Sequence, residues 1–275
     1  ITAFPVIPSR KANKMDMLLR RIRRISLIIN VKTLIIVLLS VVSTYLCIKF
    51  GFIADFPLTL IATSIVFPIV FSIGGAYKRR ETALSKYASI KAHSKSIYFV
   101  ARDWLEDPDP QIQSNIKQLL GRLLSACRSL FVQPVSQIRV NEDHVYAVFS
   151  DISLFINKDL RGAGLPSGEA SRCNQYLSKM LLDFEDVKHI YQYRTPRTLR
   201  AFSDFFITVL PPLYGPYFAY QAMEFSPELV YVMPVLFSVM FVALDNIQNH
   251  LENPFDQIGE DDISINAEEF VSRLS

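Results

Sequence analysis

Three side chains close together on one stretch of the sequence could hold a metal ion. Glu185 and Asp186 precede His189 by about one helical turn, and carboxylates and imidazole are metal ligands. A solvated helix face has the same appearance, so both interpretations stay open. The sequence contains no GxSxG, HExxH or CxxC motif and no glycine-rich phosphate loop. We therefore expect that the protein is not an enzyme.

A second group of oxygen donors lies near the C-terminus. Asn253 is followed by Asp261 and Asp262, with Gly259 between them. Calcium prefers carboxylate and carbonyl oxygens from a bent loop, although the alternating acids of an EF-hand are absent. The alternative is a solvated turn whose acids cap the next helix. We expect that no cofactor is required, and calcium at Asn253, Asp261 and Asp262 stays a hypothesis.

A third pattern is suited to controlling ion flow. Thr63, Phe67 and Phe71 recur at every fourth position, so on a helix they form one stripe. In a symmetric ring of subunits, apolar side chains at such positions gate ions by dewetting. The same stripe would also suit a helix that faces lipid or packs against a neighbour.

The composition indicates which elements must position these residues. The chain has 275 residues, of which 50% are hydrophobic and 20% charged, and its mean hydropathy is +0.23. Soluble domains carry about 25% charged residues, so an ordinary cytosolic enzyme, a disordered chain and a nucleic-acid binder are disfavoured. A helix of about 20 apolar residues crosses a bilayer. Four apolar segments approach this length: 33–50, which we expect to extend back to residue 25, 56–77, 205–222 and 229–244.

These segments form two pairs with short connections. Buried core helices are the alternative for 205–222 and 229–244, because both are short. The connections 51–55 and 223–228 contain no Lys or Arg, whereas basic residues precede the first and third segments and follow the second. Because positive residues stay on the cytoplasmic side, we expect a multi-pass integral membrane protein with both termini and the middle segment inside.

The middle of the chain predicts helices. Apolar residues of 112–131 share one helical face, and a further helix is expected over 175–193. Residues 162–168 resemble a loop. Pro211-Pro212 and Gly215-Pro216 predict a broken helix in the third apolar segment, and a simple kink or a span that ends early is the alternative. Ser226-Pro227-Glu228 predicts the start of the fourth helix.

In this layout and in its tail the sequence resembles the bestrophin family of ion channels. Glu252-Asn253-Pro254-Phe255, followed by Gly259-Glu260-Asp261-Asp262, is similar to the family's motif after the last span. Thr195-Pro196 before the third apolar segment is also similar. The residues after 262 look more like bacterial members, which lack the calcium clasp of the animal proteins.

The resemblance implies a homopentamer around one central pore. It places a hydrophobic neck at Thr63, Phe67 and Phe71, and a second constriction at Asp204, where the family has an apolar residue. Lys78, Arg79 and Arg80 would concentrate anions at the inner mouth, because clustered charge attracts counter-ions.

We therefore expect an all-α membrane protein with four transmembrane helices per chain in two hairpins and a cytosolic helical bundle. The expected regions are a basic N-terminal segment at 1–25, hairpins at 26–77 and 199–247, a cytosolic domain at 78–198 and an acidic tail at 248–275. The expected partners are the lipid bilayer, identical subunits and inorganic ions, with no nucleic acid. The leading functional hypothesis is a passive channel for chloride or other small anions. A cation-selective channel and a non-conducting membrane scaffold are the alternatives.

Overall fold

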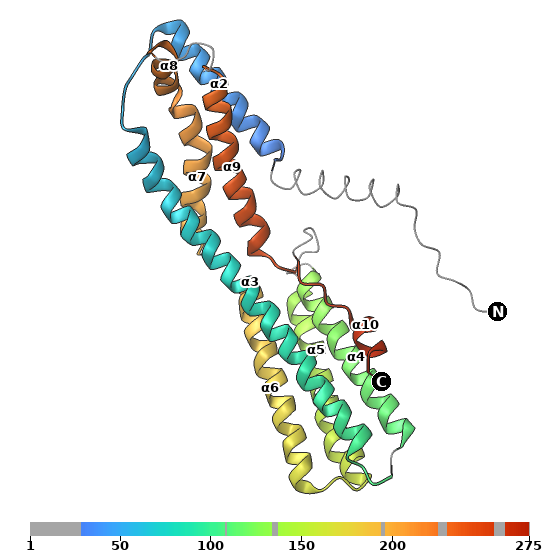
Figure 1. Ribbon diagram of the computed structural model, residues 1–275. Coiled ribbons are helices and arrows are strands. Elements are labelled where there is room, and N and C mark those ends of the chain that lie inside the picture. The colour runs from blue at the N-terminus through green and yellow to red at the C-terminus, as the bar shows by residue number, and fades with distance from the viewer. Residues whose placement is uncertain are drawn as a thin grey trace, which may run out of the picture. The chain divides into compact units, whose positions relative to one another are not determined.

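The protein is helical throughout the part that the structure describes. The computed structural model describes residues 29–107, 109–133, 137–193, 196–224, 230–255 and 262–274, and no strand occurs within these ranges. The all-α expectation is confirmed. Contacts divide the chain into two compact units, the first containing Ile1–Ala76 and Thr195–Glu252 and the second Tyr77–Arg194 and Asn253–Ser275. Figure 1 shows the helices of both units.

Helix α2 (Val31–Phe50) has a defined beginning and end. The Asn30 side chain accepts from the Thr33 backbone N–H at 3.1 Å, and Thr33 Oγ1 accepts from the Asn30 N–H at 3.2 Å. This reciprocal capping box satisfies donors that the first turn leaves free. Gly51 ends the helix with a φ of 69°. The helix therefore begins at Val31 and does not include Asn30 or Ile29; residues 25–28 lie outside the described residues.

Helix α3 (Leu58–Asp103) is a single helix of 46 residues. It contains the second apolar segment and continues without a break into the sequence that follows it. Pro68 lies inside the helix. Among the described helices, three are long and apolar enough to cross a membrane: α2, α3 and α9 (Val232–Glu252).

The third apolar segment is divided between two helices, as its prolines predict. Helix α7 (Arg197–Leu213) is followed by Tyr214, and α8 (Gly215–Glu224) begins directly after that residue. The Pro212 carbonyl lacks the usual i+4 donor, because residue 216 is a proline without an N–H. Ser43 Oγ of α2 donates to this carbonyl at 2.7 Å, and Ser40 Oγ donates to the Pro211 carbonyl at 3.0 Å. Two hydroxyls of a neighbouring helix thus bond to the last carbonyls of α7, and Ser43 takes the place of the donor that Pro216 lacks.

Helix α9 begins later and ends later than the sequence predicts. Residues 226–228, the expected start, lie outside the described residues, and residues 230 and 231 form a turn before Val232. At the other end the helix continues to Glu252. Glu252, which we expected in the acidic tail, is therefore helical and buried, as is Asp245.

The first unit packs α2, α7, α8 and α9 side by side, together with the beginning of α3 (Figure 1). Its buried core takes residues from each of these helices. Apolar burial of this kind contributes about 25 cal/mol per Å². The core contains Ile36, Ile65, Ile69, Ile207, Leu210, Tyr214, Phe218, Phe241 and Val242.

The second unit is a helical bundle. It contains the end of α3, α4 (Pro110–Val132), α5 (Ile138–Phe155), a π-helical turn (Ile156–Leu160), α6 (Ser167–Gln192) and α10 (Ala267–Ser272). The apolar face expected on 112–131 is buried in α4. Helix α6 begins at Ser167, so the loop expected at 162–168 is shorter, and α5 was not predicted from the sequence.

The tail is anchored in the second unit by an aromatic residue. Phe255 is fully buried, and its ring stacks on Phe131 with centroids 4.8 Å apart. Asn266 accepts from the Glu269 N–H at 2.9 Å and caps α10, as the sequence predicts. The Pro254-Phe255 pair thus has a packing role that the motif alone does not reveal.

Candidate functional site

The stripe on α3 leaves two phenylalanines unpacked in the single chain. The Phe67 and Phe71 side chains are 62% and 65% exposed, and their rings make an edge-to-face pair with centroids 4.6 Å apart. Thr63 is also exposed. Ile65 and Ile69 of the same helix are buried in the core. Helix α3 therefore has one face that packs in the core and an exposed face that carries the stripe.

The three basic residues of the expected inner mouth follow on α3. Lys78 is exposed, while Arg79 and Arg80 are half-buried. Arg80 Nη1 lies 2.5 Å from Glu81 Oε1, so its charge is partly compensated. Cations spaced along one helix raise the local concentration of anions.

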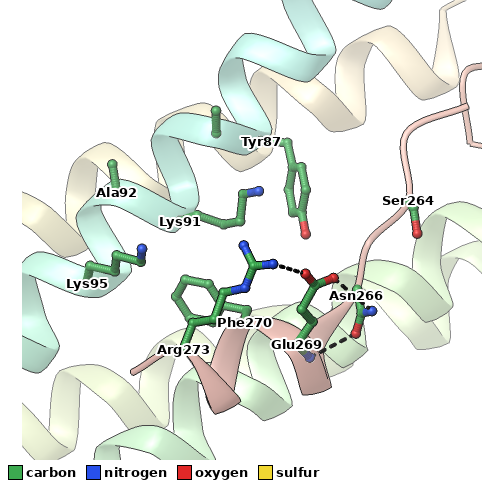
Figure 2. A pocket seen from close by; sticks show the side chains of 10 residues that line it. Tyr87, Lys91, Ala92, Lys95, Ser264, Asn266, Glu269, Phe270 and Arg273 are labelled. Carbon is green, nitrogen blue, oxygen red and sulfur yellow. Dashed lines mark hydrogen bonds and ion pairs between the residues drawn. The ribbon is translucent and has the colours of Figure 1, made fainter. Parts of the chain in front are cut away.

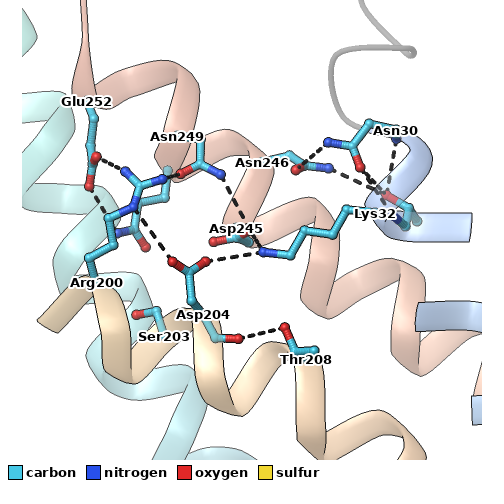
Figure 3. Close-up of polar contacts among 12 residues, drawn as sticks. Asn30, Lys32, Arg200, Ser203, Asp204, Thr208, Asp245, Asn246, Asn249 and Glu252 are labelled. Carbon is cyan, nitrogen blue, oxygen red and sulfur yellow. Dashed lines mark hydrogen bonds and ion pairs between the residues drawn. The ribbon is translucent and has the colours of Figure 1, made fainter. Parts of the chain in front are cut away.

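Asp204 lies within a cluster of charged residues that joins three helices. Lys32 Nζ of α2 lies 3.2 Å from Asp204 Oδ1 of α7 and 2.7 Å from Asp245 Oδ2 of α9. Figure 3 shows the lysine reaching both carboxylates. Asp245 is 3% exposed, whereas Asp204 is 43% exposed. A buried carboxylate needs a cation or strong donors close by, which Lys32 supplies.

Arg200 forms the other half of this cluster. Its guanidinium pairs with Glu252 and donates to Asn249 Oδ1, and its Nε lies 3.8 Å from Asp204 Oδ2. Glu252 is 5% exposed. We call these residues the charge cluster: Lys32, Arg200, Asp204, Asp245, Asn249 and Glu252. It holds three carboxylates and two cations, so Asp204 does not stand as an isolated acid.

Sequence reasoning found Asp204 but missed its partners. Lys32 directly precedes the apolar segment 33–50, and Asp245 directly follows the segment 229–244. Each of these residues is a charge at the end of an apolar segment. Because such charges are costly unless they are paired, their positions could have indicated that they contact one another. Their pairing requires α2, α7 and α9 to meet, which the sequence does not show.

Two of the three residues of the calcium hypothesis, Asn253 and Asp262, lie in the described part of the chain. Asn253 Oδ1 is buried and has no hydrogen-bond partner there, which suits an oxygen ligand. Asp261 lies outside the described residues. The described residues contain no group of three His, Cys, Asp or Glu side chains that could hold one ion, whereas calcium takes six to eight oxygens. Calcium binding at Asn253, Asp261 and Asp262 stays a prediction.

The acids beside His189 have other partners. Lys188 Nζ lies 2.6 Å from Glu185 Oε2 and 2.8 Å from Glu142 Oε1. Asp186 Oδ2 pairs with Lys86 Nζ at 2.8 Å. Both acids of the first candidate metal site therefore belong to ion pairs of the second unit: Glu185 pairs within α6, and Asp186 pairs with α3.

Comparisons with known proteins identify the fold. No family model matches the sequence, and no curated protein sequence matches it. A crystal structure of a bacterial bestrophin homologue from Klebsiella pneumoniae matches with a TM-score of 0.71 and 14% identity, over 88% of this chain and 96% of that chain. A point variant of a bestrophin homologue from the same organism matches with a TM-score of 0.71 and 14% identity, over 90% and 99%. A crystal structure of a variant membrane protein gives 0.74 at 14% identity, over 88% and 97%.

The chain therefore has the fold of the bacterial bestrophin homologues. The resemblance expected from the tail motif is confirmed at the level of the fold, along nearly the full length of both chains.

Proposed function

We propose that this chain is a subunit of a bestrophin-type passive ion channel in a membrane. The observation that carries the proposal is the fold, which matches bestrophin homologues over almost all of their length and of this chain. Three described helices long and apolar enough to cross a bilayer support it. The four-span layout and the position of both termini on the cytoplasmic side are part of the proposal.

The conducting path is proposed to lie between five copies of the chain. Phe67 and Phe71 are the largest side chains of the exposed α3 stripe, and the opposite face of α3 is packed in the core. In a ring of subunits, each position would become a belt of side chains. Apolar belts resist wetting, and ion passage then depends on their width. Thr63 would make the first belt more polar than the other two.

Small anions are the proposed permeant ions. Lys78, Arg79 and Arg80 would attract them toward the end of the stripe. The alternative, a cation-selective channel, is favoured by the charge cluster, in which carboxylates outnumber cations. In either case the protein moves ions down their gradient and performs no chemical step.

Reconstitution in a planar bilayer tests the neck. The double variant Phe67→Ala with Phe71→Ala widens and weakens the apolar belts, so single-channel conductance is expected to rise several-fold. Leu38→Ala is the matched control, since Leu38 is 62% exposed on α2 and lies off the stripe. Unchanged conductance in the double variant, at normal assembly, would contradict the neck.

The mass of the purified particle separates a channel from a scaffold. A particle of five chains around an open axis is expected. A monomer or dimer would contradict the proposed pore and would favour a membrane scaffold.

A further inference from the structure

The second unit contains a pocket whose charge is not balanced. It has a volume of about 350 Å³ and lies between α3 and α10. Volumes from about 300 Å³ upward suit small-molecule ligands. Three cationic side chains and one carboxylate line it: Lys91, Lys95, Arg273 and Glu269.

The cations come from two elements and face one opening. Lys91 and Lys95 are four residues apart on α3, so they share a helix face. Arg273 follows α10. Figure 2 shows the three side chains extending into the same space. Like charges brought together repel one another, and an anion between them would relieve that repulsion.

The carboxylate does not neutralise the lysines. Glu269 pairs with Arg273, and its Oε2 accepts from Asn266 Nδ2 at 3.2 Å. Within the described residues, no ion pair joins Lys91 or Lys95 to an acid. Lys91 Nζ lies 4.5 Å above the Tyr87 ring, which orients the ammonium without neutralising it.

A second pocket of the same unit shows what a balanced lining looks like. It also has a volume of about 350 Å³, and Arg122, Lys158, Asp151 and Asp159 line it. Arg122 Nη2 lies 3.0 Å from Asp151 Oδ2. The two pockets are equal in size, so charge is what distinguishes the first.

We propose that the pocket between α3 and α10 binds a phosphate group, with Lys91, Lys95 and Arg273 as its ligands. Phosphate carries up to two negative charges and several acceptor oxygens, which suits ammonium and guanidinium donors from several directions. The phosphate could belong to a soluble anion or to a lipid headgroup, and the same contacts would recognise both. This site is independent of the proposed conduction path.

Thermal unfolding of the full chain in detergent tests the site, because a ligand that binds only the folded state raises the unfolding midpoint. The probes are inorganic phosphate and pyrophosphate, each compared with potassium chloride at equal ionic strength. A lipid arm compares the unfolding midpoint in nanodiscs of phosphatidylglycerol with that in nanodiscs of an uncharged glycolipid, each with and without pyrophosphate. We expect a concentration-dependent rise with pyrophosphate, or a rise in phosphatidylglycerol that pyrophosphate cannot increase.

Charge removal then assigns the shift to the pocket. The double variant Lys91→Gln with Lys95→Gln should abolish the rise in the unfolding midpoint. The variant Lys158→Gln in the balanced pocket should show the same rise as the wild type. If the double variant folds poorly, Lys95→Gln alone should reduce the shift. No rise in any arm, or an equal rise in the double variant, would overturn the proposal.

Discussion

Lys32 Nζ lies 2.7 Å from Asp245 Oδ2 and thereby joins the first and last described helices of the first unit. The two residues are separated by more than two hundred positions, yet the carboxylate is almost fully buried. The neighbouring amides continue the contact, since Asn30 Nδ2 donates to Asn246 Oδ1 at 2.9 Å. Polar bonds therefore join the beginning of α2 to the last turns of α9, and the apolar core joins the rest of the two helices.

Loss of the lysine is expected to destabilise the first unit. Lys32→Met leaves Asp245 buried without its cation, and removing one partner of a buried pair costs about 3 kcal/mol. Denaturant titration of the purified protein measures the change in the free energy of unfolding. Lys49→Met is the control, because Lys49 is exposed on the same helix. Equal stability of the two variants would show that Asp245 does not depend on Lys32.

The close approach of α8 to α2 gives a second prediction. A Cβ at Gly215 would overlap with Ser43 Oγ and would lie 3.0 Å from the Ser43 carbonyl carbon. Gly215→Ala is expected to lower stability by about 2 kcal/mol, the usual cost of overpacking. Gly168→Ala, with no atom within 4 Å of its added methyl, should change stability little. A neutral Gly215→Ala would mean that the two helices separate readily.

In the second unit, Lys188 stabilises a network between α5 and α6. Burial alone would lower the pKa of Lys188, but hydrogen bonds to Glu142, Glu185 and Tyr146 outweigh it and raise that pKa. Lys188→Met should therefore cost about 2 kcal/mol, because acceptors are left without their donor. Lys179→Met, on an exposed position of α6, is the control.

The same network predicts sensitivity to acid. Burial favours the neutral form of Glu185, yet the hydrogen bonds from Lys188 and Tyr146 bring its pKa below the ordinary 4.5. A carboxyl group with a lowered pKa stabilises the fold above pH 4.5, and the contribution is lost as pH falls below that value. The loss of stability between pH 5 and pH 3 should be smaller in Lys188→Met than in the wild type. Parallel curves would contradict this coupling.

Two thiols are expected to be unreactive in the folded protein. Burial raises the pKa of Cys127 to about 12 and that of Cys173 to about 11, so almost no thiolate forms at neutral pH. In a Cys47→Ser variant, maleimide should label neither residue before unfolding, as mass spectrometry can verify. The unfolded thiols ionise near pH 9, so their contribution to stability is lost as pH rises above 9. Rapid labelling of the native protein would refute the burial.

Asp204 should affect selectivity if the proposed channel is correct. Asp204→Asn removes an acid that is 43% exposed, while Lys32 keeps its bond to Asp245. The ratio of anion to cation permeability, measured from reversal potentials, is expected to rise several-fold. Asp151→Asn, an exposed acid of the second unit, should leave the ratio unchanged. An unaltered ratio in both variants would place Asp204 away from the conducting path.

Local periodicity explains what the sequence could predict. The apolar face of α4 repeats every three or four residues, and α4 is buried along that face. Helix α5 has a comparable set in Val145, Val148, Phe149 and Ile152, but it was overlooked because charged residues fill its first turns. The end of α9 lies beyond the expected hairpin, because acids such as Glu252 are typical of a solvated tail. Only the long-range partners Lys32 and Arg200 make Asp245 and Glu252 compatible with burial.

The two serine bonds to α7 have a mechanical consequence. Ser40 and Ser43 bond to the consecutive carbonyls of Pro211 and Pro212, so a slip of one residue along either helix breaks both bonds together. The two bonds thus fix the position of the end of α7 along α2. Any rearrangement of the first unit should therefore move α2 and α7 together.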